Sequence, residues 1–365
     1  MIIQSIAINL RRLRSARGLS QAGLAQKAGV SRIAYSNIEN GKASPRVNNL
    51  QLIADALSVG MQEVVTPVPK IDFLRFRCKK MLASGQKSRR EQIVADVAFW
   101  LRDYSDLEAR LAKQRQSPLK EIKSADPMEV AAKVRKALHL KDDEPINDIC
   151  GLVEHAGVKI KFVNSDLDGF FGLSAFDKGG FPAIVVNVRE GISVERQIFT
   201  VAHELGHIVM HHGSFQKEAT VESESEEAAA DQFAGYFLMP QEAFNKSWQE
   251  NKGLHWLQSI LHIKRIYKVS YKTVIHRLIG EGVDPKIWKD FPIEYRRQYG
   301  EDLKDHKEPR PLDPLDFVED RLCALTREAL EKELISVSRA AEILGIGVED
   351  MRERIASWGL VHDNV

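Results

Sequence analysis

Hydrophobic positions at helical spacing fill the first part of the 365-residue chain. From residue 6 to residue 65, leucine, isoleucine, valine and alanine recur every three or four residues, and short polar or glycine-containing segments separate the repeats. Ser20 and Ser31 occupy N-cap positions, and Gly29 lies in the tight turn between two predicted helices. The pattern predicts an all-α domain of five helices over residues 1–66.

The next segment, residues 67–124, is predicted to be a helical linker. The sequence TPVP at residues 66–69 ends the first domain, and hydrophobic residues at helical spacing follow as far as Leu107. Asp126, Pro127 and Glu129 then form a helix start, with Asp at the N-cap, Pro at N1 and Glu at N3. We therefore place the beginning of the next domain near residue 125.

Alternating hydrophobic and polar residues predict a small β-sheet in this second domain, residues 125–300. Residues 158–163 (VKIKFV) alternate as a strand, and residues 173–176 and 181–188 predict a hairpin around the turn DKGG. Beyond Pro240 the pattern is mostly helical, and it ends in a helical tail with helix-turn-helix spacing over residues 314–365, which we expect to be an interaction or packing element. The predicted fold class is multidomain and mainly α: a five-helix domain, an α+β domain with a small sheet, and a helical C-terminal tail.

The net charge of +1 is distributed unevenly along the chain. Residues 1–65 hold eight Lys or Arg and three Asp or Glu, a net charge of +5, so the remaining residues carry −4. A basic end on a near-neutral protein is typical of nucleic-acid binding.

Two further features bear on the location of the protein. No apolar run approaches the length that spans a membrane, and polar residues interrupt the first ten positions, so we expect neither a membrane segment nor a signal peptide. Cys78, Cys150 and Cys323 are odd in number and far apart, which suits a reducing compartment and argues against a disulfide scaffold. Together they predict a cytoplasmic protein.

The most informative motif is H-E-x-x-H within residues 199–212 (FTVAHELGHIVMHH). On a helix His203 and His207 lie one turn apart, within roughly 40° of each other, so that both imidazoles reach one tetrahedral metal ion. Glu204, beside them, is placed to take a proton from a metal-bound water. Ser193 provides an N-cap for this helix.

A third metal ligand is expected from a second helix, residues 226–239, which Pro240 ends. Glu227 is the candidate ligand, and Asp231, one turn later, is placed to accept the free N–H of a ligating histidine. Glu226 is the alternative ligand if the register differs by one residue. The competing interpretation is that these acids form a solvated helix N-terminus, which the helix dipole favours.

Together these segments resemble the ImmA/IrrE family of zinc metallopeptidases, over about residues 125–282. The resemblance rests on residues 199–212, on E-x-x-A-D-x-F-A from Glu227 to Ala234, and on FLMP at residues 237–240. It implies a zincin-like fold with gluzincin-style ligands, one Zn²⁺ per chain, and cleavage of a helix-turn-helix repressor or an antitoxin-like partner after a stress signal. Asp231 stands where many relatives carry Asn, which leaves its acceptor role intact. A sheet beside the metal helix would offer an edge to which an extended peptide substrate adds as a strand.

The N-terminal segment, residues 6–65, resembles the XRE/Cro-type helix-turn-helix domain. The resemblance implies binding of double-stranded operator DNA, usually as a homodimer, with residues 31–40 as the recognition helix. The candidates for contacts to base edges are Ser31, Arg32, Ile33 and Ser36, and those for contacts to phosphates are Gln21, Asn40, Lys42 and Arg46.

Three functional hypotheses follow. The leading one is a DNA-binding regulatory zinc metalloendopeptidase with conditional activity, in which Glu204 acts as general base. The alternative is an XRE-family transcriptional regulator whose zincin domain is a sensor or partner-binding module with little or no proteolysis. The third is an antitoxin-like module of a toxin–antitoxin pair.

Overall fold

The computed structural model describes residues 2–71, 73–76, 84–216, 223–303 and 307–359. The chain folds into two compact units: unit 1, residues 1–71 with 81–104, and unit 2, residues 72–80 with 105–365. The long helix α6 (Ser84–Arg110) belongs to unit 1 up to residue 104 and to unit 2 beyond it. Cys78 lies outside the described residues.

Unit 1 contains the predicted five-helix domain. Ser20 and Ser31 cap α2 and α3 by accepting the N–H groups of Gly23 and Ala34, as the sequence predicts. Leucines and isoleucines, with Tyr35, dominate its buried core. The helices are α1 (Ile2–Ala16), α2 (Gln21–Lys27), α3 (Arg32–Glu39), α4 (Val47–Leu57) and α5 (Met61–Val65).

A buried ion pair joins α1 to α3 in unit 1. The Arg14 guanidinium donates from Nε and Nη2 to the Glu39 carboxylate at 2.8 and 2.7 Å, and Gln21 Nε2 donates to it at 3.1 Å. The Glu39 side chain is only 1% exposed. Burial opposes its ionisation, but Arg14 still holds the pKa of Glu39 below its usual value. This pair fixes the orientation of α3, the predicted recognition helix.

Unit 2 is built on a four-stranded sheet in the order β1-β3-β4-β2. β3 pairs antiparallel with both β1 and β4, and β2 pairs parallel with β4. The β3–β4 hairpin and the β2 strand confirm the sequence prediction. The strands are β1 (Phe73–Phe76), β2 (Lys159–Val163), β3 (Gly172–Phe176) and β4 (Pro182–Asn187).

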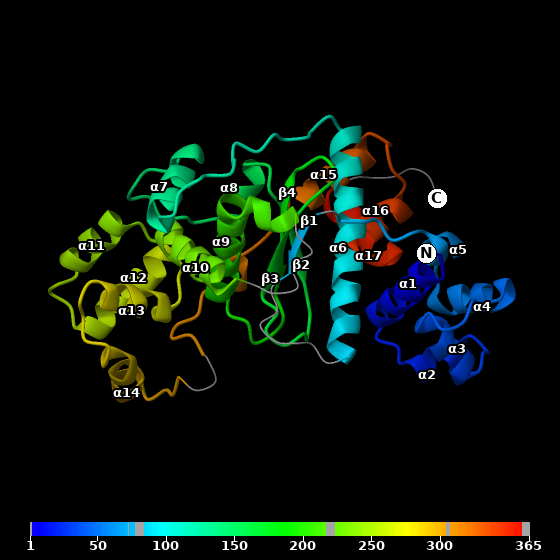
Figure 1. The fold of residues 1–365 in the computed structure, drawn as a ribbon, viewed down its shortest axis with the longest axis horizontal. Coiled ribbons are helices and arrows are strands. Elements are labelled where there is room, and N and C mark those ends of the chain that lie inside the picture. Colours follow the sequence, from blue (N-terminus) through cyan, green and yellow to red (C-terminus); the bar gives the residue numbers. More distant parts are fainter. Residues whose placement is uncertain (1, 72, 77–83, 217–222, 304–306, 360–365) are drawn as a thin grey trace. The chain divides into compact units, whose positions relative to one another are not determined.

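In unit 2, α9 packs against β3 and β4, and α10 lies alongside α9 (Figure 1). Asp126 caps α7 with Pro127 in the first turn, as predicted. In the tail, the last three helices form a small hydrophobic cluster of their own. The helices are α7 (Pro127–Ala137), α8 (Ile149–His155), α9 (Val194–Met210), α10 (Glu224–Leu238), α11 (Gln241–Glu250), α12 (Trp256–Tyr267), α13 (Tyr271–Gly280), α14 (Ile287–Tyr299), α15 (Arg321–Glu331), α16 (Val337–Leu344) and α17 (Val348–Ser357), with 3₁₀ turns η1 (His212–Gln216) and η2 (Pro314–Asp316).

Residues 67–124, predicted to be a helical linker, contain a strand as well as a long helix. Residues 73–76 form strand β1, α6 begins at Ser84, and residues 113–126 contain no helix. The sequence FLRF joins the sheet because β3, far along the chain, supplies its partner. Local hydrophobic spacing does not report such a long-range pairing.

A buried charge network ties the sheet to its surroundings in unit 2. Lys159 Nζ on β2 contacts Glu108 of α6 at 3.1 Å and Asp177 of the hairpin turn at 2.9 Å. Arg321 of α15 contacts the other oxygen of Glu108 at 2.6 Å. Since buried charges are stable only when they are paired, this network holds the tail and the end of α6 against the sheet.

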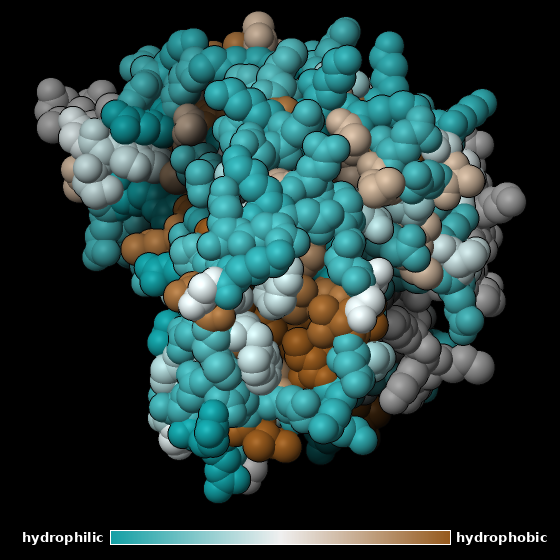
Figure 2. Space-filling model, turned by 90° about the vertical axis from the view of Figure 1, so that its left-hand side faces the viewer, coloured by the Kyte–Doolittle hydropathy of each residue, from teal (hydrophilic) through white to brown (hydrophobic). Residues whose placement is uncertain are grey.

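The face shown in Figure 2 is mostly hydrophilic. Hydrophobic side chains gather there in a hollow in the lower half of the view. Within the part of the chain that the structure describes, no helix has the length and apolar character needed to cross a membrane.

Replacing Glu39 by alanine will destabilise unit 1. Removing one partner of a buried pair costs about 3–5 kcal/mol, and we expect the lower end because Arg14 keeps some contact with solvent. Hydrogen exchange of the full-length protein measures this locally: protection of the α1 and α3 amides will fall about 100-fold or more. Lys27→Ala, on the exposed side of α2, is the matched control and will leave protection unchanged. Equal protection in wild type and Glu39→Ala would contradict the assigned role.

Candidate metal centre

The histidine motif lies on α9, which is buried on almost every side. Fourteen of its 17 residues are buried, and Ser193 caps it by accepting the Arg196 N–H, as predicted. His203, Glu204 and His207 are each only 1% exposed. Burying an ionisable side chain costs free energy unless the side chain has hydrogen-bonding or charged partners. The partners of these three residues therefore indicate their roles.

Three donor groups converge between α9 and α10. His203 Nε2 and His207 Nε2 lie 3.0 Å apart, and the Glu227 carboxylate approaches these two nitrogens at 3.4 and 3.2 Å. Donors about 2.0–2.1 Å from a tetrahedral zinc ion are separated from one another by roughly 3.3 Å. The triangle of His203, His207 and Glu227 therefore has the size and the chemistry that fit a zinc ion.

The second nitrogen of each histidine is also engaged. His203 Nδ1 lies 2.8 Å from Asp231 Oδ1, and His207 Nδ1 lies 2.9 Å from His211 Nδ1. Because a carboxylate accepts, His203 Nδ1 carries the hydrogen and Nε2 presents its lone pair to the centre. Burial lowers the pKa of His207 to about 3, so its imidazole is neutral, as a metal ligand must be.

Glu204 stands outside the triangle of donors, on the side facing the sheet. Its Oε2 accepts the hydroxyl hydrogen of Ser174, on β3, at 2.7 Å. A buried carboxylate that is not part of the donor triangle, next to a metal-sized site, has the placement of a general base.

Glu226 points to a different partner from Glu227. It accepts from Ser214 Oγ at 2.7 Å and from Arg75 Nη1 at 2.5 Å, while Arg75 Nη2 donates to Glu227 Oε1 at 3.1 Å. Burial disfavours its charge, but the hydrogen bonds from Ser214 and Arg75 hold the pKa of Glu226 below its usual value. The structure thus places Glu227, the first choice of the sequence analysis, against the histidines.

Two neighbours of the site, Ser174 and Arg75, were not anticipated. His211, one helical turn after His207, contacts the outer nitrogen of His207 and is not part of the donor triangle. Ser174 and Arg75 come from strands, and their approach depends on sheet pairing that no local pattern reports.

The predicted DNA-contact residues lie on and around α3 of unit 1. Ser31, Arg32 and Ile33 are exposed at the first turn of α3, and Ser36 is half-buried one turn later. Among the predicted phosphate contacts, Gln21 donates to Glu39 and Asn40 donates to the Ser36 carbonyl. Lys42 and Arg46, the other two, lie in and after the turn that follows α3.

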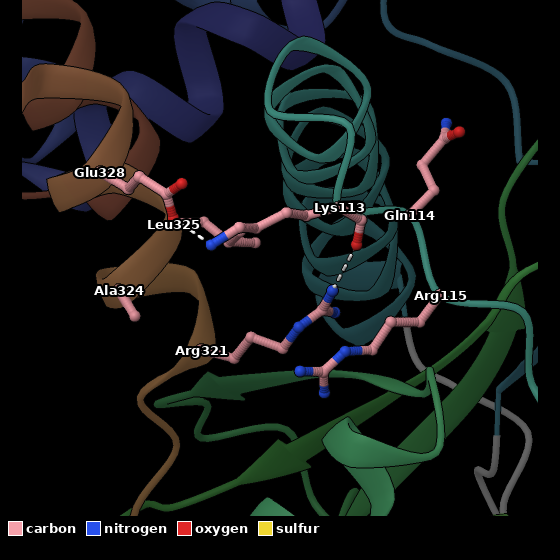
Figure 3. Close-up of a pocket in the computed structure, with 7 residues that line it drawn as sticks. All are labelled: Lys113, Gln114, Arg115, Arg321, Ala324, Leu325 and Glu328. Atoms are coloured by element: carbon pink, nitrogen blue, oxygen red, sulfur yellow. Dashed lines mark hydrogen bonds and ion pairs between the residues drawn. The ribbon is translucent and has the colours of Figure 1, made fainter. Parts of the chain in front are cut away.

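Unit 2 also contains a charged hollow away from the donor triangle (Figure 3). Lys113 pairs with Glu328, and Arg321 donates to the Lys113 carbonyl at 3.0 Å, so these groups satisfy one another. None of its lining residues belongs to the predicted site: Lys113, Gln114, Arg115, Arg321, Ala324, Leu325 and Glu328.

Comparison with known proteins adds two family matches. Residues 154–279 match the model of peptidase family M78, described as the IrrE N-terminal-like domain, and residues 10–64 match a helix-turn-helix model. A curated protein of Sinorhizobium fredii, the HTH-type transcriptional regulator y4dJ, is 35% identical over 68 residues, which are 19% of this chain and 88% of that protein. A solved structure, the apo form of the competence regulator ComR from Streptococcus vestibularis, aligns with 12% identity over 99% of this chain and 100% of its own, at a TM-score of 0.17.

The donor triangle predicts one zinc ion per chain. Wild type purified with zinc will retain about one equivalent, and His203→Ala and His207→Ala will retain little. Asp231→Ala will weaken zinc affinity about 10–100-fold, because the histidine loses the acceptor that orients it. Metal analysis and competition with a chelator measure both effects. The control is Glu224→Ala, an exposed carboxylate on the same helix, and a loss of zinc equal to that of Asp231→Ala would contradict the assignment.

Proposed function

The chain belongs to the helix-turn-helix transcriptional regulators that carry an IrrE N-terminal-like peptidase domain, and from this premise we propose that it is a DNA-binding regulatory zinc endopeptidase. The family matches support a regulatory metallopeptidase in general terms. The finer assignment rests on the placement of individual side chains.

The observation that carries the proposal is the position of Glu204. A purely structural zinc site needs its ligands and nothing more, but here a buried carboxylate lies beside the ligands and contacts the sheet through Ser174. A zinc ion held by His203, His207 and Glu227 would polarise a peptide carbonyl and lower the pKa of a water molecule.

The residues of the chain then divide the work. The Glu204 carboxylate accepts a proton from the attacking water and delivers it to the leaving amine, while the Ser174 hydroxyl holds the carboxylate in place. Asp231 fixes the ring of His203, and His211 contacts the outer nitrogen of His207. Burial of α9 excludes bulk water from this machinery.

The proposed substrate is a helix-turn-helix repressor or an antitoxin-like protein, cut in a stress or mobile-element response. Unit 1 would bring the peptidase to promoter DNA, where such a repressor is bound, with the exposed first turn of α3 in the major groove. We further propose that the chain reads its operator as a homodimer.

The second candidate is a transcriptional regulator whose zincin domain senses or binds a partner without proteolysis. One observation favours it: the guanidinium of Arg75 already occupies the acidic side of the site, at Glu226 and Glu227. A site closed in this way would turn over no substrate until Arg75 moved away.

Glu204→Gln separates these two candidates. The variant will bind about one zinc per chain like wild type, and its cleavage of the repressor proteins of the host will fall at least about 100-fold, because the proton acceptor is lost. Both proteins are incubated with those repressors, with and without single- or double-stranded DNA, and products are identified by mass spectrometry. If zinc is bound and wild type cuts nothing under any condition, the non-proteolytic regulator is the correct assignment.

Arg32→Ala and Lys42→Ala will weaken DNA binding in different ways. Loss of a base contact at Arg32 will cost about 1–3 kcal/mol and relax sequence preference, whereas loss of a phosphate contact at Lys42 will weaken all sequences and lower the salt slope by about one. The measurement uses duplexes selected by the wild-type protein from random-sequence DNA, titrated at several salt concentrations. Unchanged affinity and selectivity of Arg32→Ala would exclude α3 as the reader of sequence.

A further inference from the structure

Strand β1 occupies one edge of the sheet, next to the strand that contacts the general base. It pairs antiparallel with β3 through Leu74 opposite Ala175, Arg75 opposite Ser174 and Phe76 opposite Leu173. In the sheet order β1-β3-β4-β2, β3 would be the edge strand if β1 were absent. An edge strand has unpaired backbone N–H and C=O groups, to which an extended peptide adds as a further strand.

The register of this pairing places the side chain of Arg75 next to two acidic residues of α10. Residues directly opposite each other in a sheet project from the same face. Ser174 donates to Glu204, and its partner Arg75 donates to both Glu226 and Glu227. A strand at this edge therefore delivers the side chain at the Arg75 position to the acid pair, Glu226 and Glu227, beside the donor triangle.

The acid pair favours a cation at that position. The side chains of Glu226 and Glu227 are 27% and 10% exposed, and that of Arg75 is 11% exposed. Two neighbouring carboxylates with so little solvent need positive charge nearby, and a guanidinium meets both because its N–H groups form a planar fork. The donor triangle gives Glu227 a role as a metal ligand, but it gives none to Glu226, which contacts Arg75 and Ser214 instead.

The residue after Arg75 is held by an aromatic contact. Phe76 stacks on Phe170 with ring centroids 4.9 Å apart and planes inclined by 13°, and it is 8% exposed. An aromatic pair of this kind stabilises the strand beyond the burial of the ring alone. At this edge β1 thus places an arginine followed by an aromatic residue, each held by its own contacts.

We propose that the edge of β3 is the peptide-binding site of the peptidase, that it takes extended peptides with an arginine next to an aromatic residue, and that β1 is the chain's own occupant of this site. The proposal rests on the proposed function and names its substrate class. Glu226 is the residue that selects the arginine. β1 keeps the site closed to other peptides because it is tethered, and a tethered strand competes at an effective concentration in roughly the millimolar range.

The test measures peptide binding without cleavage, in the full chain carrying Glu204→Gln. The probe is a fluorescein-labelled peptide, IDFLRF, which copies residues 71–76, and binding is followed by fluorescence anisotropy. Adding Arg75→Ala removes the ion pairs between β1 and the acid pair. The probe will then bind at least about tenfold more tightly than it does when Arg75 is present. The zinc content of each variant is measured to confirm that the metal site is folded. The probe affinity of Arg75→Lys, which keeps the positive charge but not the planar guanidinium, will lie between those of the Arg75 and Arg75→Ala proteins.

Specificity is tested in the same Arg75→Ala background. A probe with alanine in place of arginine will bind at least about tenfold more weakly, and Glu226→Gln will remove the preference between the two probes. Hydrogen exchange at residues 172–176 of β3 will be faster in Arg75→Ala and slow again when the probe is added. The matched control is Arg296→Ala, an exposed arginine in unit 2, which will behave as the parent.

The outcomes separate this inference from the proposed function. The inference is overturned if the probe binds equally well with and without Arg75. It is also overturned if probe affinity does not depend on the arginine of the probe or on Glu226. If the chain with intact Glu204 and Arg75→Ala binds the probe and cuts neither it nor any repressor, the binding site stands and the peptidase assignment fails. If repressors are cut with no dependence on arginine, the peptidase stands and the assigned substrate class fails.

Discussion

The close approach of α9 and α10 at Gly206 determines the geometry of the whole site. A Cβ atom on Gly206 would lie 2.8 Å from a ring carbon of Phe233 and 3.5 Å from the Cα of Ala230, so a larger residue would push the two helices apart. Glu227 and Asp231 reach the histidines only because this distance is short. The glycine inside the H-E-x-x-H motif is thus as necessary to the donor triangle as the ligands that flank it.

A second glycine brings the sheet against the same helix. A Cβ on Gly172 would lie 2.5 Å from Thr200 Cγ2 and 2.9 Å from the Val185 carbonyl oxygen, which leaves no room for a side chain between β3 and α9. This contact sets Ser174 against Glu204. Base, donor triangle and sheet edge are therefore parts of one packing arrangement, in which helix and strand approach through residues without side chains.

Features that depend on local chemistry were predictable from the sequence, and features that depend on long-range pairing were not. The one-turn spacing of His203 and His207, the cap at Ser193 and the hairpin around Asp177 all follow from residues a few positions apart. Glu227 was predicted although it lies on another helix, because Glu227 and Asp231 are spaced one helical turn apart, as His203 and His207 are. β1 was not predicted: four residues carry too little periodic signal, and their conformation is decided by β3.

The electrostatics of the acid pair indicate how β1 would leave the sheet edge. If β1 departed alone, Glu226, whose side chain is 27% exposed, would lose the Arg75 guanidinium, and a partly buried charge that loses its partner is costly. If a second strand brought its own arginine to the same position, the charge would stay compensated and the backbone hydrogen bonds of β3 would be replaced one for one. Exchange is therefore favoured over simple opening. Such a site stays closed in the absence of its substrate. Only a peptide with a suitable cation replaces the positive charge that Arg75 of β1 supplies, so the contact that selects the substrate also opens the site.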